Sequence, residues 1–117
     1  MSQKAKKKMS YGNIKQLNSA GAQFAASAAA IYTAPSGKAA EVAALILHNT
    51  NTSSETVKLY FRGTAAANRM FQAGLAANET LEFSPKVPLV LQGGEVLGGE
   101  TTTVSKVNVI VLGREEA

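Results

Sequence analysis

One stretch of the sequence alternates apolar and polar side chains without a break, Val57-Lys58-Leu59-Tyr60-Phe61-Arg62. Successive side chains on a β-strand point to opposite faces, so an alternation with a period of two predicts a half-buried strand. The odd-numbered residues, Val57, Leu59 and Phe61, are expected to face the core. The even-numbered residues, Tyr60 among them, are expected to face solvent.

Working outward from this stretch, the last part of the chain repeats the pattern. Val107, Val109 and Val111 form one apolar face, and Ile110 stands on the opposite face between two of them. Valine also favours strands because its branched side chain packs well on a pleated surface. The end of the chain is therefore predicted to be a strand with Ile110 directed outward.

Three further stretches have strand character. Residues 80–83 alternate over a shorter length. Residues 87–91 alternate around Pro88, which favours an edge strand because proline cannot donate a ladder hydrogen bond. Residues 42–49 are apolar on both faces, which fits either a fully covered strand or a short helix. The polar loop at residues 50–54 that follows them favours the strand.

Residues 22–34 are ambiguous, because alanine is the best helix former and is frequent there. Against a helix, Ala34-Pro35-Ser36-Gly37 is typical of a β-turn, with proline at its second position and glycine at its fourth. A strand that ends at Thr33 is the favoured interpretation. The pairs Gly93-Gly94 and Gly98-Gly99 are each expected to form a tight turn, and their spacing is not that of a phosphate-binding loop.

The apolar runs recur between turn residues at spacings of about 8–12 positions, which is typical of an all-β sandwich or barrel. The chain of 117 residues has the length of one domain. We predict a single antiparallel β-sandwich over residues 22–117, jelly-roll-like or immunoglobulin-like, with about seven or eight strands. Residues 1–21 are polar and basic, and we interpret them as an extended basic N-terminal arm.

The excess positive charge lies at the start of the chain. Lys4, Lys6, Lys7 and Lys8 carry +4, whereas residues 9–117 hold eight basic residues and eight glutamates, a net charge of 8 − 8 = 0. No hydrophobic stretch follows the lysines, so we expect no secretory signal peptide. We interpret the arm as an assembly or solubilising segment that contacts an acidic protein surface. Nucleic-acid binding through phosphate charge is the less favoured alternative, because the arm has no arginine and the body has no basic face.

The composition argues against catalysis and metal binding. The chain has no cysteine and no aspartate, and His48 is its only histidine. A nucleophilic site needs a nucleophile, a base and a group that orients the base, and these residue types are too scarce to supply one. Glu79 and Glu82 would fall on opposite faces of a strand. We therefore expect a protein that is not an enzyme, with no cofactor and no metal, in which His48 has a structural or surface role.

Six segments contain distinctive turns and strand ends: residues 31–39 with the turn Tyr32-Thr33-Ala34-Pro35, residues 46–51 ending in Asn-Thr-Asn, residues 57–61, residues 75–81, residues 91–97 with Leu-Gln-Gly-Gly-Glu, and the valine-rich end at Gly113-Arg114-Glu115. Together they resemble small β-sandwich structural proteins of tailed bacteriophages. The resemblance covers roughly residues 30–115 and does not include the arm.

This resemblance implies a non-enzymatic virion protein, first of all a capsid decoration or cement protein on the lattice of the major capsid protein. A place in the neck, tail or baseplate of the particle is the alternative. The implied partners are the major capsid protein or other virion proteins and further copies of this chain, without a membrane. The implied location is the virion, assembled in the host cytoplasm.

We predict partner contacts through the N-terminal lysines and two outward residues of the sandwich: Lys4, Lys6, Lys7, Lys8, Tyr60 and Ile110. A module that binds host carbohydrate is a further alternative. Sugar sites generally use exposed aromatic platforms, and the chain has three tyrosines, four phenylalanines and no tryptophan. With Phe61 and Phe83 expected to face inward, few aromatics are left for that role.

Overall fold

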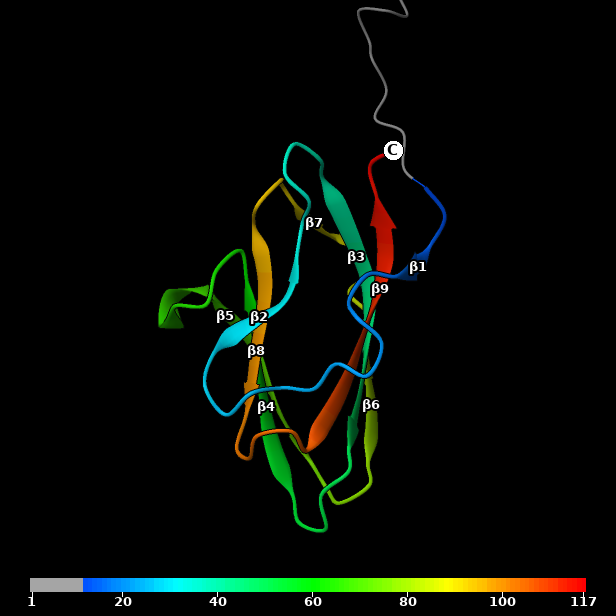
Figure 1. Ribbon diagram of the computed structural model, residues 1–117. Coiled ribbons are helices and arrows are strands. Elements are labelled where there is room, and N and C mark those ends of the chain that lie inside the picture. The colour runs from blue at the N-terminus through cyan, green and yellow to red at the C-terminus, as the bar shows by residue number, and fades with distance from the viewer. Residues whose placement is uncertain (1–11) are drawn as a thin grey trace, which may run out of the picture.

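The fold is taken from a computed structural model, which describes residues 12–117 (Figure 1). Within this range the chain forms nine strands and one short 3-10 helix, and no α-helix. The elements are β1 (Lys15–Gln16), β2 (Ala29–Thr33), β3 (Ala40–Asn49), β4 (Glu55–Phe61), η2 (Ala66–Asn68), β5 (Arg69–Leu75), β6 (Thr80–Phe83), β7 (Leu89–Leu91), β8 (Val96–Thr101) and β9 (Val107–Glu115). The all-β prediction is confirmed.

The strands form two antiparallel sheets that lie as facing layers in a β-sandwich-like arrangement (Figure 1). One sheet has the order β1-β9-β3-β6, with β7 also paired to β3, and the other has the order β2-β8-β4-β5. The strand number exceeds the predicted seven or eight because β1 is a separate two-residue strand and β6 and β7 both pair with β3. Every strand pair is antiparallel, as predicted.

The core fills the space between the two sheets. The sequence places Val107, Val109 and Val111 on the inner face of β9, and the structure confirms this, with each at most 1% exposed. On the facing sheet Val57 and Leu59 are fully buried, as predicted. Burial of these branched side chains from both sheets supplies the main hydrophobic stabilisation of the fold.

Residues 42–49 belong to a strand, which resolves the ambiguity between strand and helix. β3 contains a register shift against β9 between Val42 and Ala44. Before the shift the inward residue is Val42, and after it the inward residues are Leu45 and Leu47. A β-bulge inserts one extra residue, so a simple period of two does not hold across it.

The turn after β2 lies one residue later than the sequence indicates. β2 ends at Thr33, as predicted, but the turn hydrogen bond runs from the N–H of Lys38 to the carbonyl of Pro35, at 3.1 Å. Gly37 is therefore the third turn residue, and its φ of +77° is the value that a type II turn requires at that position and that glycine tolerates. The helical alternative for the alanine-rich stretch before β2 is wrong.

Of the two glycine pairs, only Gly93-Gly94 forms a turn. Gly94 has φ +87° in the connection from β7 to β8. Gly98 and Gly99 lie inside β8, so the prediction of a second turn is wrong. Gly99 is needed there because the ring of Phe24 packs where a side chain would project.

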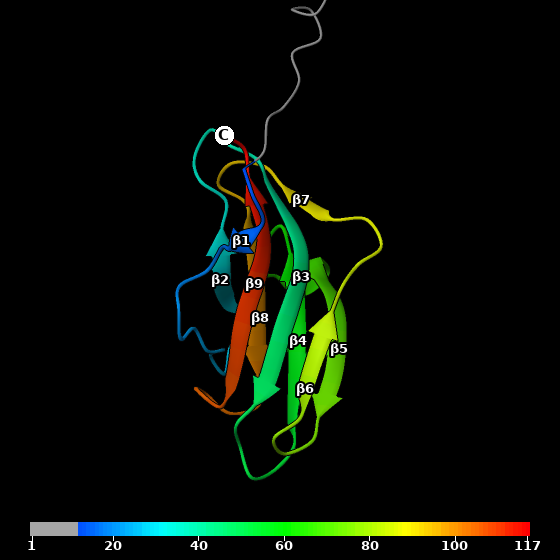
Figure 2. The ribbon, with the colours of Figure 1, turned by 90° about the vertical axis from the view of Figure 1, so that its right-hand side faces the viewer.

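The described part of the predicted arm, residues 12–21, runs along β9 (Figure 2). β1 pairs with β9, and the N–H of Leu17 donates to the carbonyl of Val111 at 2.7 Å. The Asn18 side chain donates to the carbonyl of Val109 and accepts from the N–H of Val111, both at 3.0 Å. The sheet therefore begins before residue 22. Lys4, Lys6, Lys7 and Lys8 lie outside the described residues.

Candidate interaction surface

The predicted contact residue Ile110 belongs to β9 of the β1-β9-β3-β6 sheet, the sheet shown in front in Figure 2, and its side chain points to the outer face. It is 37% exposed and stands directly opposite Ile46 of β3. The next outward pair along the same two strands is Leu112 opposite Ala44. We call these four residues, Ala44, Ile46, Ile110 and Leu112, the β3–β9 outer face. They form an apolar strip across two central strands, and the outward position predicted for Ile110 is confirmed.

Polar groups surround this strip. At one end His48 pairs with Asn108, and the Nδ1 of His48 lies 2.8 Å from the hydroxyl of Thr80. At the other end the guanidinium of Arg114 lies 3.2 Å from the carboxylate of Glu41. On the β6 side the neighbour of Ile46 is Glu82, which is exposed. An apolar centre with a polar rim is the anatomy of protein–protein interfaces.

Tyr60, the second predicted contact residue of the sandwich, does not offer its surface to a partner. Its position opposite Gly98 puts it on the outer face of the other sheet, as the alternation indicates, but it is only 4% exposed. The phenol donates a hydrogen bond to the carboxylate of Glu100, and this bond raises the pKa of Tyr60. The prediction of an exposed Tyr60 is wrong, because neighbouring side chains cover the ring.

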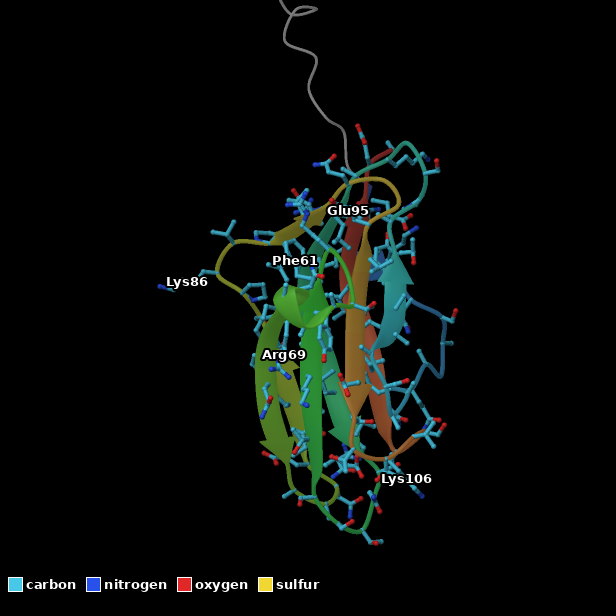
Figure 3. The ribbon with its side chains drawn as sticks, turned by 90° about the vertical axis from the view of Figure 1, so that its left-hand side faces the viewer. Phe61, Arg69, Lys86, Glu95 and Lys106 are labelled. Carbon is cyan, nitrogen blue, oxygen red and sulfur yellow. The ribbon has the colours of Figure 1, made fainter. Side chains whose placement is uncertain are left out.

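Phe61, next to Tyr60, is half-buried instead of fully buried. The pairing of β4 with β5 shifts at this point, since Leu59 faces Phe71 whereas Tyr60 faces Arg69. Figure 3 shows Phe61 and Arg69 at this end of the two strands. The regular alternation that begins at Val57 therefore ends at Tyr60, and Phe61 does not reach the centre of the core.

The outer face of the β2-β8-β4-β5 sheet holds a shallow polar depression of about 340 Å³ between β4, β5 and β8. Its lining includes Thr56, Lys58, Gln72 and Glu100. The carboxylate of Glu100 is engaged by the phenol of Tyr60. These groups include one ammonium and one hydrogen-bonded carboxylate, which suit water or a polar contact and do not form a nucleophile with a neighbouring base.

A buried polar cluster closes the end of the sandwich near residues 49–55. The Nδ2 of Asn49 donates to the carbonyls of Ser53, Leu75 and Ala76 at 3.0–3.1 Å. This side chain is fully buried and joins the loop after β3 to the loop after β5. Sequence reasoning did not find this role, because an asparagine at the end of an apolar strand gives no sign of its distant partners.

Glu55 completes this cluster and is only 2% exposed. Its carboxylate accepts from the N–H of Thr103 and from the Nδ2 of Asn51, each at 2.8 Å. Burial by itself would raise the pKa of Glu55, but these hydrogen bonds and the nearby charge of Lys106 outweigh burial and hold the pKa below its usual value. The polar atoms of the cluster find hydrogen-bond partners within the protein, and these bonds hold three loops together.

Glu79 and Glu82 also have separate surroundings. Glu79 lies in the turn before β6, where its carboxylate accepts from the N–H of Ala76 at 2.7 Å, and Glu82 lies within β6.

Residues 12–117 contain no group of three or more histidine, cysteine or acidic side chains arranged to hold a metal ion. In the same range no helix has the length and apolar character needed to cross a membrane. No family model, curated protein or solved structure matches the chain.

Proposed function

We propose that the protein is a non-enzymatic structural component of a bacteriophage particle, a decoration or cement protein that packs on the major capsid protein lattice. The observation that carries the proposal is the β3–β9 outer face, in which exposed Ile110 and half-buried Ile46 form an apolar centre within a polar rim. A subunit of this kind works by burying such a face against a neighbour and needs no reactive group.

The strand order supports a jelly roll over an immunoglobulin-like sandwich. Apart from β4 to β5 and β6 to β7, each connection between consecutive strands passes from one sheet to the other. An immunoglobulin-like sandwich keeps more of its neighbouring strands within one sheet. Jelly rolls are built from two interlocked Greek keys and form viral capsid domains and lectins. The topology therefore fits a shell component, and the sequence resemblance to phage structural proteins points the same way.

The charges of the β3–β9 outer face suit a protein partner. Arg114 and Glu41 neutralise each other at one end of the face. A nucleic acid would require a concentration of positive charge, which this face does not have. The four lysines near the N-terminus supply a separate positive segment, which we assign to contacts with an acidic region of the neighbouring shell protein.

The test is the copy number and position of the chain in purified particles. Densitometry or quantitative mass spectrometry gives its ratio to the major capsid protein, and antibody labelling in electron micrographs gives its position. A ratio comparable to that of the major capsid protein, with label over the head, is the expected result. A few copies at the neck, tail or baseplate would move the protein to that part of the particle, and its absence from particles would refute the proposal.

A further inference from the structure

β5 is an edge strand with little protection against pairing to another strand. It pairs with β4 on one side and ends the sheet on the other (Figure 3). From Phe71 to Leu75 it contains no charged residue and no proline. Natural edge strands generally carry lysine, proline or a bulge that prevents pairing with a second chain. In β5 such protective features lie only at its start, where Arg69 is charged and Met70 forms a bulge without a partner on β4.

The other edges of the two sheets are protected. β1 has two residues, and β7 follows Pro88 and has three. β6 carries exposed Glu82 and is followed by Pro85. β2 has a register shift next to Ile31. Its Tyr32 also donates a hydrogen bond to Glu115 of β9 at 2.7 Å, which ties this edge to the other sheet. Among the described edge strands, β5 alone has five successive uncharged residues in regular pairing, because the uncharged β2 is interrupted by its register shift.

The sequence of β5 is complementary to itself in one antiparallel register. If Gln72 stands opposite Gln72 of a second copy, Phe71 faces Ala73, and Met70 faces Gly74. In these two pairs each large side chain meets a small one on the same face of the sheet, and the outermost pair is Arg69 opposite Leu75. The space beside Gly74 is open, because no atom lies within 4 Å of the position that a Cβ would take. Met70, which is 37% exposed, has the length to fill that space.

We propose that two copies of this chain associate through β5, in antiparallel register about Gln72, to form a closed dimer with one continuous sheet. An antiparallel pair of identical strands is two-fold symmetric, so it buries both free edges and leaves none to continue a fibre. The pairing satisfies backbone groups at the edge and adds side-chain contacts on both faces, as in strand addition between proteins.

The dimer has a geometric consequence for the rest of the molecule. A two-fold axis perpendicular to the joined sheet keeps equivalent faces of the two copies on the same side. Both β3–β9 outer faces would then point in one direction, so that a dimer could engage a flat lattice at two sites and gain avidity. The proposed dimer depends on the β5 edge alone. It can therefore be tested separately from the proposed place in a virion.

The test uses charge at position 72 and measures mass by sedimentation velocity over a series of concentrations. Wild type should approach twice the chain mass of 12.2 kDa as concentration rises. Gln72→Glu places two like charges across the two-fold axis and should weaken the dimer about tenfold or more in Kd. Within one copy the new carboxylate lies opposite Lys58 of β4, so the fold should be retained.

Gln72→Lys should weaken the dimer in the same way, and an equimolar mixture of Gln72→Glu and Gln72→Lys should restore it as a mixed dimer. The matched control is Thr33→Glu, which adds the same charge to the other edge strand of the same sheet, and it should dimerise like wild type. If Gln72→Lys fails to fold, the concentration dependence of amide exchange in wild-type β5 provides the second measurement. A monomeric wild type, an unaffected Gln72→Glu, or equal disruption by Thr33→Glu would overturn the proposal.

Discussion

The ring of Phe24 occupies the space in which a side chain at Gly99 would project. A Cβ built on Gly99 would lie 2.7 Å from the Cδ1 of Phe24, closer than real atoms approach. Phe24 is 1% exposed and comes from the segment before β2, whereas Gly99 lies within β8. A glycine inside a strand thus admits the largest fully buried side chain of the core.

We expect Gly99→Ala to destabilise the protein by about 1–3 kcal/mol, the usual cost of overpacking a core. Phe24→Leu should relieve the clash by shortening the ring side chain. In a double-mutant cycle measured by urea denaturation, the two changes together should cost less than the sum of the single changes, with a coupling of about 0.5–3 kcal/mol. Strict additivity would show that the two residues do not share this space.

The core positions of β4 should differ in their contribution to stability. Leu59 is fully buried, so Leu59→Ala should cost about 2–5 kcal/mol. Phe61 is half-buried, so Phe61→Ala should cost less, roughly 1–2 kcal/mol. The free energy of unfolding from urea denaturation gives both values, and a larger loss for Phe61 than for Leu59 would contradict the arrangement of β4 and β5 described above.

Much of the sheet structure could be predicted from periodicity. The alternation of valines in β9 gave both the strand and the outward direction of Ile110, because a regular strand has a fixed period of two. Register shifts next to Ile31 in β2, after Val42 in β3 and at Met70 in β5 break that period, and they depend on the neighbouring strand. β5 itself was not predicted, since the segment Arg-Met-Phe-Gln-Ala-Gly-Leu has no β-branched residue and contains alanine and glycine, which are depleted in strands.

The candidate surface was predicted less completely than the sheets. Alternation gives the direction of a side chain but not the cover that neighbours provide, and therefore Tyr60 was expected to be exposed when it is not. Ile46 was hidden among apolar residues on both sides of β3, and only its pairing with Ile110 identifies it as part of a surface. The roles of Asn49 and Glu55 depend on loops far away in the sequence.

Glu55 should make stability depend on pH in the acid range. Its pKa is lower in the folded state than the ordinary value of about 4.3 in the unfolded chain. The stabilisation is therefore fully present above about pH 4.3 and is lost as the pH falls through the folded pKa, because the unfolded state takes up the proton first. We expect Glu55→Gln to be less stable than wild type at pH 7. As the pH is lowered, its free energy of unfolding should fall less steeply than that of wild type.

The measurement is the free energy of unfolding between neutral pH and about pH 3 for wild type and Glu55→Gln. Glu82→Gln is the matched control, since it removes an exposed glutamate from β6 and leaves the buried cluster intact. The difference between wild type and Glu55→Gln should shrink as the pH falls. A constant difference across this range would mean that the carboxylate of Glu55 is not the group responsible.

Ile110 tests the β3–β9 outer face without disturbing the core. Ile110→Glu introduces a charge at the centre of the face, and an interface that buries it unpaired would lose much of its affinity. The melting temperature should change little because the side chain points outward. In a pelleting assay with reconstituted particles, we expect Ile110→Glu to be lost from the pellet. The control is Val104→Glu, at a 56% exposed position in the loop between β8 and β9, and it should pellet like wild type. Equal binding by both variants would refute this face as the contact surface.

The N-terminal lysines should contribute to binding and not to folding. Removal of residues 1–10 deletes the net charge of +4 and leaves β1, which begins at Lys15, in place. The melting temperature should therefore stay the same, and binding to the particle should weaken, more strongly at low salt because salt screens exposed charges. A full-length variant with glutamine at positions 4, 6, 7 and 8 should behave like the truncation, since it loses charge but not length.

If nucleic acid is the partner instead, wild type will retard DNA of any sequence in a mobility-shift assay, and neither variant will do so. Unchanged binding in both assays would leave these lysines with no role in assembly.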